Sequence, residues 1–228
     1  YYTSYCQKDY TKRIIMKFKF FNSDGSANGD KEVANFPVLD DEKGVDALRQ
    51  SIIAVHANQR QGNASTKVRS EVRGSGKKIY RQKGLGVGRA GDKKATQRRG
   101  GGIVFGPRPR SYSQKLNKKL KLLAMKRALV DQANSENIVL IEEWKVSEPK
   151  TKLFHGIMNK IVPDAKKVLA IDDSFDDQFA LAARNLPTAR LGRAQDLGPL
   201  DIVQCDQIIL SLKGLNILLA KFNMEAAN

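Results

Sequence analysis

The sequence predicts an α/β protein: a single three-layer domain with a mostly parallel sheet, into which a long, extended, basic loop is inserted. After Asn137, short β-rich runs alternate with helical patterns of about 10–15 residues, which is typical of a parallel sheet covered on both faces. The net charge of +16 is also unevenly placed, because Arg60–Arg127 holds 21 Lys and Arg against 2 acids. The remainder holds 40 − 21 = 19 bases and 24 − 2 = 22 acids. A near-neutral domain, residues 16–61 and 112–228, therefore carries one basic insert, residues 62–111.

The first elements are predicted to be a hairpin and a helix. Met16–Phe21 alternates apolar and basic residues, as a half-exposed strand does. Asn22–Asp30 is a cluster of turn residues, and Lys31–Leu39 is expected to pair back onto the first strand. Apolar residues at helical spacing then predict a helix within Gly44–Gly62.

A second helix is predicted at Gln114–Ala133, after the insert. One of its faces is apolar, with Leu and Ala at helical spacing. The opposite face is expected to carry Lys115, Lys118, Lys119, Lys121, Lys126 and Arg127. Such a face is often only solvated surface, but this one adjoins the insert, so we expect it to contact the same polyanion.

The rest of the chain is predicted to alternate strands and helices. The expected strands are Asn137–Trp144, Lys167–Asp172, a short strand from Ala189, and Asp206–Leu212. The expected helices are Thr151–Ile161, Ser174–Pro187 and Leu215–Phe222. Ser174 and Asp177 have the spacing of a capping box at the start of the second of these helices.

The insert has a composition that does not build a core. Gly62–Gly106 contains 11 of the 18 glycines, interleaved with Lys and Arg. Glycine loses the most backbone entropy on ordering, so we expect this segment to be disordered alone and to order against a polyanion. If it doubles back on itself, about 22 residues each way at ~3.3 Å per residue reach ~70 Å. A domain radius is only roughly 17–18 Å.

The polyanion is predicted to be nucleic acid. No apolar run approaches the roughly 18–20 residues that span a bilayer, and the insert lacks the apolar face of a membrane-surface helix. Cys6 and Cys205 lie far apart and suggest neither a disulfide framework nor a metal cluster. Residues 1–15 form an N-terminal extension without a secretory signal pattern and without an assigned role.

Several motifs have a non-functional interpretation. Gly86–Gly91 has the spacing of a dinucleotide-binding fingerprint, but neither a strand precedes it nor a helix follows it. Carboxylates after the strand Lys167–Asp172 could hold a catalytic metal, although acids at a turn and a helix N-terminus are a simpler explanation. His56 and His155 have no nucleophile nearby in the sequence and are interpreted as packing or surface residues.

Longer motifs resemble a known family. EVRGSGKKIYRQKG (Glu71–Gly84), RRGGGIVFGPRPRSYSQKL (Arg98–Leu116) and FALAARNLP (Phe179–Pro187) are similar to the bacterial-type ribosomal protein four family of the large subunit. The resemblance implies a structural, assembly-promoting protein of the cytoplasmic ribosome, without enzymatic activity or cofactor. It implies as partners large-subunit ribosomal RNA, neighbouring ribosomal proteins including a second tunnel-lining protein, and the nascent peptide in transit, but no membrane.

The resemblance also implies residue roles. The cations expected to hold RNA by position are Lys67, Arg69, Arg73, Lys77, Lys78, Arg81, Arg99, Arg108 and Arg110. Residue types add further RNA-binding candidates, namely Arg60, Gly74, Gly76, Tyr80, Arg98, Gly100, Gly101, Gly102, Phe105, Lys115, Lys118 and Lys119. The expected tip near the exit tunnel is Gln82, Lys83, Gly84, Leu85, Gly86, Val87, Gly88 and Arg89. The tip departs from the family pattern, in which Thr-Gly-Arg-Ala-Arg follows Lys-Gly, and Arg98 replaces a Trp.

Two alternative functions remain open. One is a metal-dependent nuclease or phosphoryl-transfer enzyme that uses Asp172 and Asp173. The other is a free regulatory RNA-binding protein, which would not sediment with large subunits at high salt.

Overall fold

A computed structural model describes residues 16–40, 42–146, 148–163 and 165–223. The predicted N-terminal extension, residues 1–15, lies outside these ranges. The chain forms two compact units. The α/β unit comprises the described residues up to Val55 and from Lys115 onward, and the insert unit comprises His56–Gln114.

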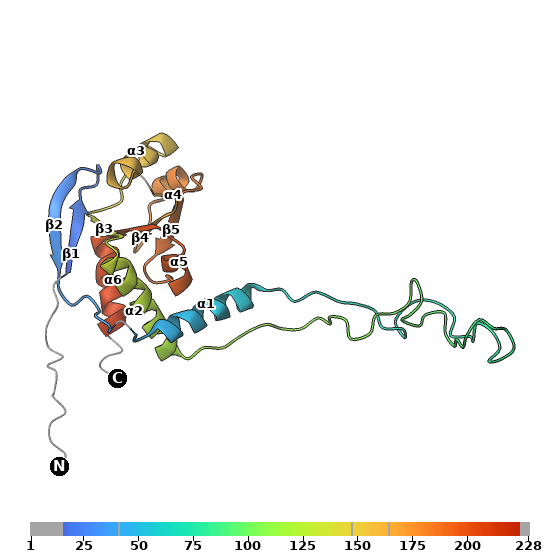
Figure 1. Ribbon diagram of the computed structural model, residues 1–228. Helices are drawn as coiled ribbons and strands as arrows, with labels where there is room; N and C mark the ends of the chain where they lie inside the picture. The colour runs from blue at the N-terminus through green and yellow to red at the C-terminus, as the bar shows by residue number, and fades with distance from the viewer. Residues whose placement is uncertain (1–15, 41, 147, 164, 224–228) are drawn as a thin grey trace, which may run out of the picture. The chain divides into compact units, whose positions relative to one another are not determined.

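The α/β unit is built on one six-stranded sheet of order β2-β1-β3-β6-β4-β5. Its strands are β1 (Met16–Phe21), β2 (Ala27–Val33), β3 (Ile138–Ile141), β4 (Val168–Asp172), β5 (Ala189–Arg193) and β6 (Gln207–Ser211). Figure 1 labels all of these strands except β6. Among the strands that the structure describes, only the edge pair β1–β2 is antiparallel, and the other four pairs are parallel. The prediction of a mostly parallel sheet is therefore confirmed.

The central strands are buried on both faces. Along β4, Leu169 and Ile171 belong to one hydrophobic cluster, and Val168 and Ala170 belong to another. Successive side chains of a strand point to opposite faces, so the two clusters lie on the two sides of the sheet. This arrangement explains why β3 and β4 have continuous apolar sequences instead of alternating ones.

Helices cover both clusters and complete the three layers. The first cluster receives side chains from α1 (Val45–Gln59), α2 (Lys118–Asn134), α5 (Pro199–Val203) and α6 (Leu212–Asn223). The second receives side chains from α3 (Thr151–Ile161) and α4 (Asp177–Ala183). Each of these helices except α5 corresponds to a helix that the sequence predicts.

The hairpin and α4 differ locally from the prediction. The strand β2 begins at Ala27, inside the predicted turn cluster, because a tight turn closes where Gly25 N–H donates to Asn22 (3.0 Å) and Gly25 has a φ of 76°. The predicted capping box at Ser174 is wrong. The N-cap of α4 is Asp176, which makes no side-chain capping bond.

The short helix α5 was not predicted. Its first residue is Pro199, whose fixed φ suits the first helical turn. The Gly198 N–H donates to the carboxylate of Asp201 at 3.2 Å. A five-residue helix is too short to produce a hydrophobic period in the sequence.

The predicted basic face of α2 is partly wrong. Arg127 is buried, and its guanidinium contacts Asp131 at 2.6 Å and donates to the Asp40 carbonyl at 2.9 Å. Lys126 donates to the Phe222 carbonyl at 3.2 Å. Both cations thus make their contacts within the α/β unit, since a charge that is removed from water needs a local partner. Lys115, Lys118, Lys119 and Lys121 remain exposed.

Candidate nucleic-acid interface

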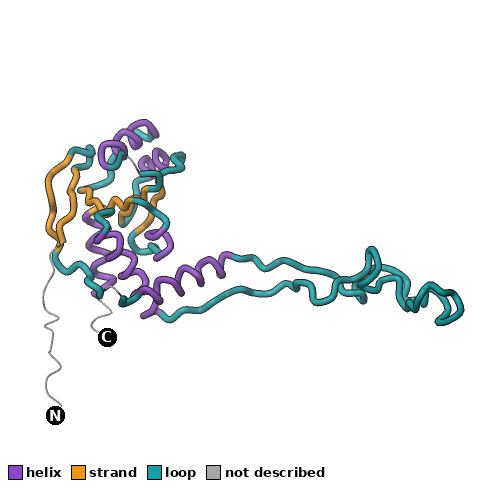
Figure 2. The backbone as a smooth tube through the Cα atoms, viewed as in Figure 1, coloured by secondary structure: helices purple, strands orange, loops and turns teal. Residues whose placement is uncertain are grey.

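The insert unit contains neither helix nor strand between Arg60 and Gln114, and Figure 2 shows this stretch as loop. Its two halves are nevertheless paired by backbone hydrogen bonds. Thr66 N–H donates to Pro107 at 3.0 Å, and Ile103 N–H donates to Lys67 at 2.9 Å. These two bonds set the register between segments about forty residues apart, which no sequence periodicity indicates. Within the second half, Gly102 N–H donates to Lys94 at 3.0 Å and closes a local turn.

Glycines make this pairing possible by close approach. A Cβ on Gly102 would lie 2.2 Å from the Arg69 nitrogen, and one on Gly101 would lie 2.0 Å from the Ala95 carbonyl oxygen. A Cβ on Gly106 would lie 2.0 Å from the Thr66 hydroxyl. Gly101 and Gly102, expected to face RNA, thus face the backbone of the insert itself.

Three other predicted glycines keep open space. Nothing lies within 4 Å of a Cβ built on Gly76 or Gly100, and only the Lys94 side chain, at 3.5 Å, approaches Gly74. These positions leave the backbone accessible to a partner. The glycines of the insert therefore divide into an internal set and an open set, and residue type alone does not distinguish them.

The two acids of the insert are used inside it. Glu71 accepts from Arg108 at 2.8 Å and from Val68 N–H at 3.1 Å. The hydrogen bond from Arg108 is the main cause that lowers the pKa of Glu71, with the Val68 N–H next. Asp92 accepts from the N–H of Lys94 at 3.0 Å. Both acids thus fix local turns and pairing.

Most cations of the basic stretch have no acidic partner. Within Arg60–Arg127, only Arg108 and Arg127 form ion pairs with other residues that the structure describes. Subtracting these from the 21 Lys and Arg leaves 21 − 2 = 19. Unpaired like charges at this density along a stretch of chain favour the binding of a polyanion.

The predicted RNA contacts are mostly exposed. The exposed ones are Arg60, Lys67, Arg69, Arg73, Gly74, Gly76, Lys77, Lys78, Arg81, Arg99, Gly100, Phe105, Arg108, Arg110, Lys115, Lys118 and Lys119. Tyr80, Arg98 and Gly101 are half-buried, and Gly102 is buried. Exposure makes the first group available to a ligand, and the burial of Gly102 makes it part of the internal pairing.

The predicted tip, residues 82–89, is exposed throughout. Gly84, Gly86 and Gly88 all have positive φ angles, of 85°, 67° and 79°. The left-handed region is costly for residues with a Cβ, so this run of turns depends on glycine. Arg81 donates to the carbonyl of Gly84 at 3.1 Å, and Lys78 bonds Gln82.

Phe105 exposes an aromatic side chain from a backbone conformation that is uncommon for such a residue. Phe105 is fully exposed and has a φ of 51°, which is uncommon for a residue with a bulky side chain. Ile103 and Val104 beside it are also more than half exposed. Exposed apolar surface held by a strained backbone is typical of a binding segment.

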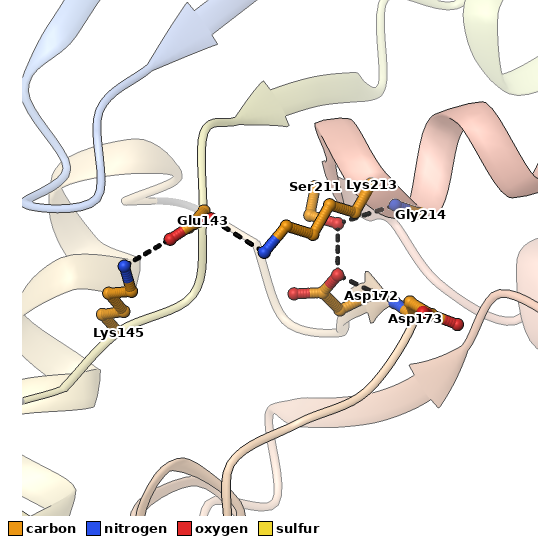
Figure 3. A network of polar contacts seen from close by, with 7 residues as sticks. All are labelled: Glu143, Lys145, Asp172, Asp173, Ser211, Lys213 and Gly214. Atoms are coloured by element: carbon orange, nitrogen blue, oxygen red, sulfur yellow. Dashed lines mark hydrogen bonds and ion pairs between the residues drawn. The ribbon is translucent and has the colours of Figure 1, made fainter.

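Asp172, the first of the two alternative catalytic carboxylates, is held by structural contacts (Figure 3). Asp172 accepts from the Ser211 hydroxyl at 2.6 Å and from Asp173 N–H at 2.8 Å. Ser211 accepts in turn from Gly214 N–H at 2.9 Å, so the pair caps the start of α6. Within the part of the chain that the structure describes, no group of three His, Cys, Asp or Glu residues could hold a metal ion.

A carboxylate beside this cap forms two ion pairs. Glu143 contacts Lys145 at 2.5 Å and Lys213 at 2.8 Å (Figure 3). The hydrogen bonds from Lys145 and then Lys213 lower the pKa of Glu143 to about 2. This network connects the segment after β3 to the start of α6.

Sequence reasoning assigned no role to Tyr112 at the end of the insert. The structure places its ring against two of the candidate cations, Arg60 at 3.7 Å and Arg110 at 4.4 Å from the guanidinium carbon to the ring centroid. The sequence signal was an aromatic residue two positions from an arginine, which is too common to be specific.

These features define a class of protein: a three-layer α/β domain that carries a cation-rich, glycine-rich insert with its own internal pairing. The chain belongs to the Ribosomal protein L4/L1 family, whose profile matches residues 35–220. The expected resemblance to this ribosomal family is thereby confirmed.

The chain is similar to proteins that carry the name large ribosomal subunit protein uL4. The protein of Acholeplasma laidlawii is 46% identical over 164 residues, which cover 72% of this chain and 79% of the relative. That of Staphylococcus haemolyticus is 40% identical over 188 residues, 82% of this chain and 90% of the relative. That of Brevibacillus brevis is 37% identical over 195 residues, 86% and 93%. Among the described residues, no helix has the length and apolar character of a membrane span.

Proposed function

We propose that this protein is a structural, non-enzymatic constituent of the large ribosomal subunit in the cytoplasm, where it binds large-subunit ribosomal RNA and promotes its assembly. The observation that carries this proposal is the set of 19 cations between Arg60 and Arg127 without an acidic partner among the described residues. Family membership and the names of the relatives support the ribosomal setting.

The chemistry of the insert favours RNA over other polyanions. Arg and Lys neutralise phosphates, and Arg also stacks on unpaired bases or donates to two oxygens at once. Open glycines such as Gly76 leave the backbone N–H accessible. The exposed ring of Phe105 offers a surface on which a base can stack. A purely electrostatic surface would not need an exposed aromatic side chain.

The insert is proposed to extend into folded RNA and to bring residues 82–89 to the nascent-peptide exit tunnel, beside a second tunnel-lining protein and the peptide in transit. Doubled back, a segment of this length reaches at most ~70 Å. The tip is small and rich in glycine, and its exposed cations are Lys83 and Arg89. Crosslinking in intact ribosomes, with the attached nucleotides mapped for Lys83 and Arg89, tests this placement directly.

The salt dependence of RNA binding tests the role of the insert. If about 8 cations meet phosphates, the slope of log affinity against log salt is about −6 to −7. Lys77→Gln with Lys78→Gln should flatten the slope of binding to a large-subunit RNA transcript by about 1.4–1.8. A matched control is Lys166→Gln with Lys167→Gln, which removes two adjacent exposed lysines from the α/β unit.

Equal effects of the two double variants would contradict RNA binding through the insert. Co-sedimentation at high salt tests the ribosomal assignment separately. A chain that binds RNA but never sediments with large subunits would be a free regulatory protein instead. Protease cleavage within residues 62–106 in the free protein, with protection in the subunit, is expected if the RNA orders the insert.

A further inference from the structure

We propose that Tyr112 is a positioning residue that holds Arg60 and Arg110 and thereby keeps the two ends of the insert unit joined before RNA binds. The part of this inference that concerns RNA rests on the proposed RNA-binding function. Its structural part concerns the free protein and can be tested without RNA.

One ring is contacted by two cations. The guanidinium carbon of Arg60 lies 3.7 Å from the centroid of Tyr112, and that of Arg110 lies 4.4 Å from it. Both distances are within the range of cation–π attraction. Two guanidinium groups that share a neighbour would repel each other, and the electron-rich ring offsets that repulsion. The pKa of Tyr112 is lowered, first by the neighbouring Arg110 guanidinium and further by the charge of Arg60.

The backbone on either side of the ring is paired as well. Gln114 N–H donates to the side-chain oxygen of Asn58 at 2.7 Å, and the Asn58 amide donates back to the Gln114 carbonyl at 3.3 Å. Arg110 N–H donates to the Gly62 carbonyl at 3.2 Å. The two ends of the insert unit, 58–62 and 110–114, are thus joined on both sides of Tyr112.

Gly62 is required for this approach. It has a φ of 72°, and a Cβ on it would lie 2.1 Å from the Arg110 carbonyl oxygen and 3.2 Å from the Tyr112 ring. From the sequence, Gly62 was predicted to end a helix. In the structure it is also the contact point between the two ends.

The stack suits an RNA-binding role. A guanidinium that contacts a ring with its face keeps the N–H groups at its edge free to donate to phosphate oxygens. Fixing the planes of Arg60 and Arg110 in advance removes part of the entropy that each would lose on binding. Joining the ends of a long loop in the free protein likewise removes its closure entropy from the binding step.

Hydrogen exchange at the Arg110 and Gln114 amides in the free, full-length protein measures how firmly the two ends of the insert unit are joined. Tyr112→Leu removes the aromatic ring and should accelerate exchange at both amides roughly five- to thirty-fold, if each cation–π contact has its usual strength. Tyr112→Phe keeps the ring and should restore slow exchange. For the exchange measurement, which involves no RNA, Tyr80→Leu is a matched control, because Tyr80 is a half-buried tyrosine of the same insert with no cation against its ring among the described residues.

RNA binding then separates positioning from a purely structural role. Tyr112→Leu keeps every cation, so its affinity for a large-subunit RNA transcript should fall by up to the same factor while the salt slope stays unchanged. Tyr112→Phe should bind like the wild type, and the thermal unfolding midpoint of the α/β unit should be the same in all variants.

Exchange that is equally fast in Tyr112→Leu, Tyr112→Phe and the wild type would contradict the proposal that Tyr112 keeps the two ends of the insert unit joined. Accelerated exchange with unchanged RNA affinity would overturn positioning and leave only a structural contact. A wild-type protein that binds RNA without any salt dependence would instead contradict the proposed function, whatever the exchange data show.

Discussion

The close approach at Gly102 makes a sharp prediction about the insert. In Gly102→Ala, the new Cβ would lie 2.2 Å from the Arg69 nitrogen and 2.6 Å from its Cα, whereas ordinary contacts of such atoms are about 3.5–4.0 Å. The neighbouring segments must therefore separate by more than ~1 Å. That separation breaks the two bonds between these segments, from Ile103 N–H to Lys67 (2.9 Å) and from Thr66 N–H to Pro107 (3.0 Å).

The expected magnitude follows from those two bonds. At about 0.5–1.5 kcal/mol each, the local pairing loses about 1–3 kcal/mol. Hydrogen exchange at the amides of Thr66 and Ile103 in the full-length protein should then accelerate roughly 5- to 150-fold.

Gly76→Ala is the matched control. A Cβ there has nothing within 4 Å, so this variant should leave exchange unchanged and can even be slightly stabilising, because alanine restricts the unfolded chain. If Gly102→Ala exchanges like the wild type and like Gly76→Ala, the internal pairing does not exist in the free protein and the glycine argument fails.

Three further predictions concern individual carboxylates. The pKa of Glu143 falls from 4.5 to about 2, so its stabilising ion pairs are present above pH 4.5 and are lost as the pH falls towards 2. Glu143→Gln should weaken the pH dependence of the thermal unfolding midpoint over that interval, and the difference from the wild type should be larger at low salt than at high salt. Asp172→Ala leaves the buried Ser211 hydroxyl without its acceptor and should lower the unfolding free energy by about 1–3 kcal/mol, whereas the exposed Asp196→Ala should change little. A loss of metal-stimulated RNA cleavage in Asp172→Ala would instead revive the nuclease alternative. Glu71→Gln removes the ion pair with Arg108 and should increase protease cleavage near Val68 and Arg108 in the free protein, and unchanged cleavage would contradict the bracing role of Glu71.

The fold followed from local patterns wherever those patterns were long. β3 and β4 are four and five buried residues in a row, and helix α3 was predicted with the bounds that it has. The short helix α5 and the start of β2 were missed because a few hydrogen bonds and one left-handed glycine decide them. Arg127 was assigned to the wrong face of α2, because a charged residue near the edge of an apolar face is buried only if a partner such as Asp131 is present.

By itself, the sequence determined the α/β class, the family and the position of the basic insert, since apolar period and charge density are properties of short windows of chain. Only the tertiary structure decided what individual insert residues do. It separated Gly102, which contacts Arg69, from Gly76, where an added Cβ would meet nothing within 4 Å, and it brought Arg60 and Arg110 to the ring of Tyr112. Most of these partners are tens of residues apart in the chain, and the three-dimensional register of the paired segments, which no local pattern encodes, sets which of them meet.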